Sequence, residues 1–143
     1  MLPLSKNIKG LEKDIDKKLW QKRKVFALLS REINDLHGKT LGIIGKGSIG
    51  MKVGRIAKAF GMNINYFSVR NYKKTQFLKF LSSLDYLSVH CPLNEKTKDL
   101  ITIKELKIMK KNMILINTAR GGIVNENDLT KALKQKIIAG AGI

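Results

Sequence analysis

Short apolar runs alternate with helical segments along the chain from Gly38 onward. Four of the runs have the length and the β-branched or aromatic character of buried strands. They cover residues 40–44, 63–67, 86–89 and 113–116, and a fifth run begins at Ile137. Strands that alternate with helices predict βαβ units, and therefore an α/β domain built on a doubly wound parallel sheet.

The segment between the first two of these runs has a helical period. Four of its apolar residues share one helical face, and they are Ile49, Val53, Ile56 and Phe60. Gly61 follows as a C-cap, so the spacing predicts a helix over residues 49–60.

Two further helices are predicted from their N-terminal caps. Thr102 and Glu105 have the spacing of a capping box, in which each residue satisfies a backbone N–H near the other, and the helix should continue through Met109. Asn125 supplies an N-cap for a helix that contains residues 129–133.

Residues 1–38 differ from the rest because they contain no β-rich apolar run. Leu11, Ile15 and Leu19 recur at helical spacing, with charged residues between them. We therefore expect one amphipathic helix over residues 11–20, within a helical lead-in that ends at Gly38.

The composition restricts the class of protein. A chain of 143 residues with 43% hydrophobic content can bury one core but is short for two. Cys91 is the only cysteine, which favours a reducing compartment such as the cytoplasm. The N-terminus has no signal-peptide apolar core, and no apolar run reaches the length of a membrane span. We expect a cytoplasmic protein without a membrane partner.

The formal net charge of +17 raises nucleic acid as a partner. The lysines, however, are scattered as single residues and as pairs such as Lys17-Lys18 and Lys73-Lys74, without a long basic block or interleaved aromatic residues. This distribution favours a solvated surface, and we expect no nucleic-acid partner. A basic nucleic-acid-binding domain stays an alternative that a steep salt dependence of DNA binding would support.

A glycine-rich turn lies between the first strand and the helix that follows it. Gly45, Gly47 and Gly50 form a G-x-G-x-x-G pattern. The first glycine permits a tight turn, the second lets the backbone approach a diphosphate, and the third lets the helix pack on the strand. The anion then lies on free N–H groups at the helix N-terminus. In this context the pattern predicts a Rossmann-type dinucleotide-binding domain over residues 39–143.

The end of the second strand indicates which dinucleotide binds. NAD-binding domains usually carry Asp or Glu there for the ribose 2′-hydroxyl. This chain has Ser68 and Arg70 instead, and no acidic residue occurs between Asp35 and Asp85. Arg70 could pair with a 2′-phosphate, which favours NADP. The alternative is NAD, with Ser68 alone bonding the ribose.

Several motifs resemble the D-isomer-specific 2-hydroxyacid dehydrogenases, the family of glycerate, hydroxypyruvate, phosphoglycerate and D-lactate dehydrogenases. The similar segments are residues 36–45, 56–62, 89–101 and 109–125. The last of them resembles the signature that carries the family's catalytic arginine. The resemblance implies hydride transfer between NAD(P) and a small D-2-hydroxy acid or 2-oxo acid.

The resemblance also implies roles for individual residues. Arg120 would bind the substrate carboxylate and polarise the 2-oxo group. Ser48 and Ile49 would meet the diphosphate. The nicotinamide side would be lined by Thr118, Ala119 and Arg120, and the adenosine and linker side by Cys91, Pro92 and Thr97.

Other reactive side chains are expected to have less direct roles. His90 follows the third strand, but it does not match the family's catalytic histidine, so we expect it to support the structure. Cys91 has no neighbouring metal-ligand pattern, so we expect a lining residue and no metal site. His37 is expected to be exposed.

The resemblance implies that part of the family's catalytic machinery lies outside this chain. The family's acid/base pair, a histidine oriented by a glutamate, would follow a strand that resembles residues 138–143, and residues 1–8 resemble the end of the inter-domain helix. We expect a fragment cut at both ends and inactive alone, from a full-length enzyme that forms a homodimer. The alternative to an enzyme is a nucleotide sensor or corepressor-like module on the same fold.

Overall fold

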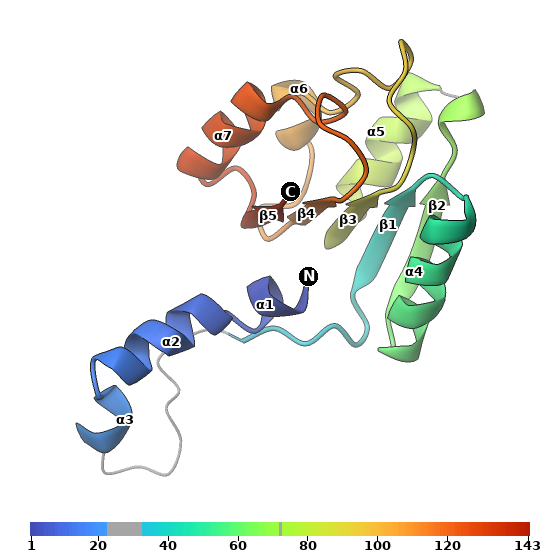
Figure 1. The fold of residues 1–143 in the computed structure, drawn as a ribbon. Coiled ribbons are helices and arrows are strands. Elements are labelled where there is room, and N and C mark those ends of the chain that lie inside the picture. Colours follow the sequence, from blue (N-terminus) through green and yellow to red (C-terminus); the bar gives the residue numbers. More distant parts are fainter. Residues whose placement is uncertain (23–32, 72) are drawn as a thin grey trace. The chain divides into compact units, whose positions relative to one another are not determined.

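A computed structural model describes residues 1–22, 33–71 and 73–143, which fall into two units, residues 1–36 and 37–143 (Figure 1). The first unit contains three helices: α1 (Leu2–Ser5), α2 (Ile8–Asp16) and α3 (Leu19–Lys22). The single helix predicted over residues 11–20 is therefore wrong in extent. Lys18 has a φ of 54° and interrupts the helix, because such a left-handed residue cannot continue it.

The second unit is built on a five-stranded parallel sheet. Its strands are β1 (Thr40–Ile44), β2 (Asn63–Phe67), β3 (Tyr86–Val89), β4 (Ile114–Asn117) and β5 (Gly140–Gly142). Their order is β2-β1-β3-β4-β5, so the direction of winding reverses between β1 and β3. The predicted α/β class is confirmed, and the first three strands match their predicted bounds.

The last two strands begin later than predicted. β4 begins one residue further on, at Ile114, and β5 begins at Gly140 instead of Ile137. Ile137 instead completes the turn after a helix, because its N–H donates to Ala132 O at 2.9 Å. Ile138 is buried but lies in a bend that leads into the strand.

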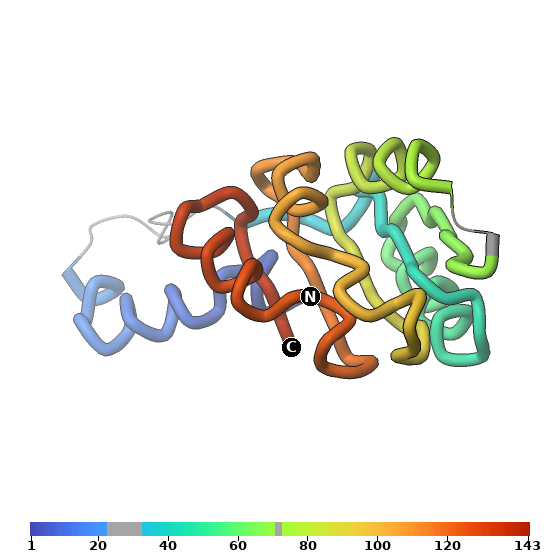
Figure 2. Tube along the Cα trace, turned by 90° about the horizontal axis from the view of Figure 1, so that it is seen from above, coloured from blue at the N-terminus to red at the C-terminus, as the bar shows by residue number. Residues whose placement is uncertain are grey.

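Helices cover both faces of this sheet. They are α4 (Ser48–Ala59), α5 (Lys74–Ser82), α6 (Ile103–Leu106) and α7 (Glu126–Lys134), with a short 3₁₀ turn η1 (Val69–Asn71) after β2. α4 lies on one face, and α5, α6 and α7 lie on the other (Figure 1). Viewed from above, these three helices follow one another across the sheet (Figure 2).

The main core lies between the sheet and these three helices. Ile44, Leu87 and Leu115 come from the sheet and are fully buried. Phe67 contacts Phe77 of α5, with ring centroids 4.9 Å apart. Contacts between aromatic residues therefore hold α5 against the end of β2. The sequence pattern did not predict this helix.

α4 packs on the sheet through small residues and not through the predicted apolar face. Gly50, Gly54 and Ala57 are buried, whereas Ile49 and Phe60 are 66% and 49% exposed. A Cβ on Gly54 would lie 2.0 Å from the Tyr66 hydroxyl, so only glycine permits this close approach. The apolar stripe of α4 therefore faces outward.

Both predicted N-caps are present. The Glu105 carboxylate accepts a hydrogen bond from the Thr102 N–H at 3.0 Å, which completes the capping box. α6 nevertheless ends at Leu106, not at Met109 as predicted, because the chain continues in turns. Asn125 caps α7 by accepting from the Asp128 N–H at 3.0 Å.

Candidate functional site

The loops that follow β1, β2, β3 and β4 meet at one edge of the sheet. These loops and the start of α4 contain all of the residues predicted to bind cofactor or substrate. In parallel sheets of this kind, ligands bind beyond the carboxyl ends of the strands, at the point where the winding reverses. Here that point lies between β1 and β3.

The glycine-rich turn has the geometry that its sequence predicts. Gly45 has a φ of 103°, and a Cβ there would lie 2.6 Å from His90 O. A Cβ on Gly50 would lie 2.1 Å from Gly45 O, so the start of α4 rests directly on the turn. A Cβ on Gly47 would meet nothing within 4 Å, so this backbone is open to a ligand. That a diphosphate binds there stays a prediction.

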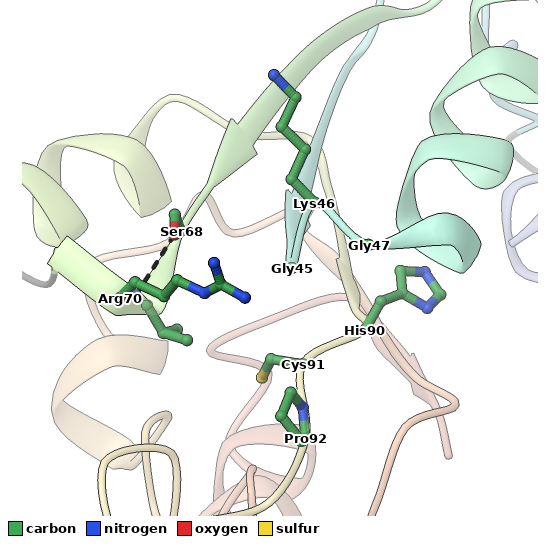
Figure 3. Close-up of a pocket in the computed structure, with 9 residues that line it drawn as sticks. Gly45, Lys46, Gly47, Ser68, Arg70, His90, Cys91 and Pro92 are labelled. Carbon is green, nitrogen blue, oxygen red and sulfur yellow. Dashed lines mark hydrogen bonds between the residues drawn. The ribbon is translucent and has the colours of Figure 1, made fainter.

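The first cavity of the groove has a volume of about 310 Å³ and lies over the ends of β1, β2 and β3 (Figure 3). Its lining comes from the glycine turn and from the loops after β2 and β3: Gly45, Lys46, Gly47, Ser68, Val69, Arg70, His90, Cys91 and Pro92. The structure thus brings together six of the residues predicted to bind cofactor. Ser68 Oγ lies 3.4 Å from the Arg70 N–H, which donates to it.

The second cavity, of about 440 Å³, adjoins the first and extends to the end of β4. It is lined by residues of α4 and of the loops after β3 and β4: Ile49, His90, Cys91, Pro92, Leu93, Thr118, Ala119 and Arg120. The predicted nicotinamide-side residues therefore share one cavity with the predicted diphosphate-binding Ile49. Ser48 begins α4 beside them, with its side chain exposed and outside both linings.

Arg120 lies at the tip of the loop after β4. Asn117 shapes this loop, because its side chain donates to Arg120 O at 3.0 Å and accepts from the Ala119 N–H at 3.2 Å. The guanidinium itself donates only to Ala119 O, at 2.8 Å, and forms no ion pair among the described residues. Its remaining donors are available to an anion.

His90 and Cys91 follow β3 and occur in the linings of both cavities. His90 Nε2 lies 2.8 Å from Ser88 Oγ, and burial lowers the pKa of the imidazole. Burial also raises the pKa of the Cys91 thiol, so this residue is protonated at neutral pH and is a poor nucleophile. His37 is exposed, as predicted.

Thr97 does not join the lining residues, although it was predicted to contact the adenosine side. It is fully buried, and its hydroxyl donates to Pro92 O at 2.6 Å and accepts from the Asn94 N–H at 2.8 Å. Its hydroxyl therefore holds the loop after β3, and its contact with the adenosine side stays a prediction.

Sequence reasoning missed several lining residues, notably Lys46, Val69 and Leu93. Lys46 is an unspecified position inside the glycine motif, and its Nζ lies 5.6 Å from the Tyr66 ring centroid. A third cavity beside Arg70 involves the loop after β3, through Asn94, Glu95 and Lys96. These contacts depend on the meeting of distant loops, which spacing alone does not reveal.

Two features are absent from the described part of the chain. No three His, Cys, Asp or Glu side chains gather where they could hold a metal ion. No helix among these residues has both the length and the apolar character needed to cross a membrane.

Comparison with known proteins identifies close relatives of this domain. The family described as D-isomer specific 2-hydroxyacid dehydrogenase, NAD binding domain, matches residues 1–143. The glyoxylate reductase of Thermococcus litoralis is 46% identical over 117 residues, which cover 76% of this chain and 35% of that protein.

Solved structures give the same result. An acyclic imino acid reductase in complex with NADPH and D-Arg has a TM-score of 0.83 at 29% identity, over 98% of this chain and 46% of that one. A D-isomer specific 2-hydroxyacid dehydrogenase of Lactobacillus delbrueckii ssp. bulgaricus, in its NAD complexed form, has a TM-score of 0.79 at 32% identity, over 97% of this chain and 44% of that one. The chain thus spans less than half the length of these relatives.

Proposed function

The chain belongs to the D-isomer-specific 2-hydroxyacid dehydrogenase family, as its NAD-binding domain, and from this premise we propose that it binds NAD(P) for an oxidoreductase acting on a small D-2-hydroxy acid or its 2-oxo counterpart. The observation that carries the proposal is the position of Arg120. Its unpaired guanidinium lines the same cavity as Ile49 and Thr118, at the far end of the groove from Ser68 and Arg70.

We propose one direction for a dinucleotide in this groove. Its diphosphate would lie over Gly47, where the backbone is open and the first N–H groups of α4 are free to donate. The adenosine would extend toward Ser68, and the nicotinamide toward Thr118. The bound nicotinamide supplies the hydride chemistry, while the protein orients the ring and excludes water.

Arg120 is proposed to bind the carboxylate of the 2-oxo acid and to polarise its carbonyl. A guanidinium presents paired donors that match a carboxylate, and it stays charged at every relevant pH. Asn117 fixes the loop, so the donors are held in place before substrate arrives. Proton transfer is not assigned to any residue of this chain, because none matches the family's histidine and glutamate.

The test is Arg120→Ala in the full-length gene product. We expect kcat/KM for small 2-oxo acids such as glyoxylate to fall by about a thousandfold, with cofactor Kd changed less than about threefold, because the lost contact is to substrate. Arg55→Ala removes an exposed arginine of α4 and is the matched control. Wild-type turnover by Arg120→Ala would refute the proposal.

We further propose that NADP is preferred over NAD. Ser68 and Arg70 stand where NAD-specific domains carry an acid, and both line the first cavity with Lys46. We expect NADPH to bind at least about tenfold more tightly than NADH, and Arg70→Ala to remove that difference. Titration followed by the fluorescence of the reduced nicotinamide measures both constants. Tighter binding of NADH to the unaltered chain would contradict this preference.

A homodimer of the full-length protein is also proposed. The outward stripe of α4 exposes Ile49, Ile56 and Phe60 to the extent of 66%, 50% and 49%, and such a cluster is a candidate contact for a second copy. Sedimentation velocity of the full-length protein at several concentrations measures the assembly state, and a monomer throughout would rule the dimer out.

A further inference from the structure

The two cavities of the groove meet at the loop after β3. Three residues line both of them: His90, Cys91 and Pro92. A dinucleotide that extends from Ser68 to Thr118 must pass over this junction, and the middle of such a molecule is its diphosphate. The side chains at the junction are therefore the ones placed to contact the diphosphate.

Only one of these three side chains is a strong hydrogen-bond donor. Pro92 has none, and the Cys91 thiol is a weak donor that is 3% exposed. The imidazole of His90 has two ring nitrogens, and it faces the side of the groove where α4 begins, away from Arg70 (Figure 3). It is the side chain at the junction that matches an anionic ligand.

One ring nitrogen of His90 is already held. Ser88 is 6% exposed, and its Oγ lies 2.8 Å from His90 Nε2, which fixes the ring orientation. No described group forms a hydrogen bond with Nδ1. A fixed ring with a free nitrogen beside an open groove is the arrangement of a ligand-binding histidine.

We propose that His90 is a cofactor-binding residue whose Nδ1–H donates to a diphosphate oxygen of the bound dinucleotide, with Ser88 holding the opposite nitrogen. This inference rests on the proposed function, since it requires a dinucleotide in the groove. It assigns a direct contact to a residue for which the sequence indicated only a supporting role.

Both ring nitrogens of His90 have a suitable hydrogen-bond partner whether the ring is neutral or protonated. Diphosphate oxygens only accept, so Nδ1 must carry a proton, and in the neutral ring the Ser88 hydroxyl then donates to Nε2. If the ring takes up a second proton, the hydroxyl rotates and accepts from Nε2–H. Ser88 supports both states, and the ligand's negative charge favours the protonated one.

Binding should consequently be coupled to proton uptake. The charged groups that line the same cavities are Lys46, Arg70 and Arg120, and burial raises the pKa of the neighbouring Cys91 thiol. NADH has no 2′-phosphate that titrates between pH 6 and 8. We expect it to bind the chain about threefold to tenfold more tightly at pH 6 than at pH 8.

Proton NMR of the chain tests the contact directly, because its only two histidines are His37 and His90. We expect NADH and ADP to shift the imidazole resonances of His90 and to raise its pKa, with His37 unaffected. AMP, which lacks a diphosphate, should leave both residues unchanged. An AMP shift as large as that of ADP would overturn the proposal, as would no shift with ADP.

Calorimetry on the same samples separates this proposal from the proposed function. If neither NADH nor NADPH binds, the proposed function fails. If NADH binds and the His90 resonances do not move, only the His90 contact fails.

Two variants give an independent readout. His90→Phe removes both nitrogens and should weaken NADH binding about tenfold and abolish the pH dependence. His90→Asn keeps a donor near the position of Nδ1 and should recover most of the affinity, without pH dependence. His37→Asn is the control. Unchanged affinity in a folded His90→Phe variant would overturn the proposal.

Discussion

Residues 37–84 and residues 85–143 form the two sides of the groove by different means. The first part contributes an open backbone besides the side chains of Ser68 and Arg70, since its three motif glycines bring a turn and a helix start together without side chains between them. The second part contributes side chains on loops, with His90 after β3 and Arg120 after β4. Backbone amides suit a diphosphate, whereas a carboxylate substrate needs a charged side chain of defined position.

The same two parts differ in charge. Residues 37–84 contain nine Lys and Arg and no acid, whereas residues 85–143 contain six acids. Several of these acids hold the structure: Asp85 accepts from the Thr40 N–H at 2.8 Å, and Asp128 accepts from the Ile103 N–H at 2.9 Å. The part that would receive the adenosine therefore has no carboxylate of its own to repel a phosphate, and structural carboxylates are confined to the other part.

Gly50→Ala should disrupt the glycine turn, the backbone contribution of residues 37–84, and it should have the largest effect of the substitutions considered. The added Cβ would lie 2.1 Å from Gly45 O, so the helix start must move off the turn. We expect a loss of about 2 kcal/mol in the free energy of unfolding and a loss of cofactor affinity of about a hundredfold. Urea unfolding and calorimetric titration measure the two effects.

Gly47→Ala is the matched control for this change. Its Cβ would meet nothing within 4 Å of the protein, so the free energy of unfolding should change by at most about 1 kcal/mol while cofactor affinity still falls. Equal destabilisation by the two substitutions would mean that Gly47 is needed for folding and not for ligand approach.

Glu105→Gln tests the structural carboxylates of residues 85–143. Glu105 is 2% exposed and forms an ion pair with Lys74, so it links α6 to the start of α5. Burial alone would raise the pKa of this carboxyl, but hydrogen bonds from Lys74 and Thr102 outweigh burial and lower it below its usual range. We expect Glu105→Gln to cost about 1.5 kcal/mol of stability at pH 7.

The sign of the pH dependence follows from that lowered pKa. The carboxylate stabilises the fold fully above its unfolded-state pKa, and this contribution is lost as the pH falls through the lower folded-state pKa. The difference in unfolding free energy between wild type and Glu105→Gln should therefore shrink on acidification from pH 7 to about pH 3. Glu95→Gln, at an exposed carboxylate, is the matched control.

The glycine turn and the strands were predictable because their signals are local. A G-x-G-x-x-G after an apolar run specifies a strand, a turn and a helix within one short segment, and the structure has all three. α5 was missed because no cap precedes it, and its apolar residues matter only through their contact with Phe67. The inward face of α4 was missed because its packing residues are glycines and alanine, which periodicity does not detect.

The candidate site was predictable to a similar degree. Gly45, Ser68 and Arg120 follow strand ends, so topology alone brings them to one edge of the sheet. The partnership of His90 with Ser88 and the burial of Thr97 depend on side-chain directions inside loops. Sequence spacing does not determine those directions, so the hydrogen bonds that hold Thr97 inside its loop were not predicted.

Asn125→Ala should have the smallest effect on stability. It tests how far residues 85–143 depend on the hydrogen bonds of one polar side chain. Asn125 accepts from the Asp128 N–H at the start of α7, and its side-chain amide donates to Asp99 Oδ1 at 2.9 Å. Losing the cap should cost about 1 kcal/mol. Asn127→Ala, at an exposed position one residue inside α7, should be neutral or slightly stabilising, because alanine favours helix.

Thermal unfolding of the two asparagine variants measures this difference, and NADH titration adds a second readout. The loop that carries Arg120 precedes α7, but the turn at Gly45 does not depend on it, so NADH affinity should be retained in Asn125→Ala. A fall in NADH affinity larger than the fall in stability would mean that α7 positions the cofactor site. The backbone and side-chain contributions to the groove would then not be separable. Residues 37–84 and 85–143 would differ in sequence but not in their contribution to cofactor binding.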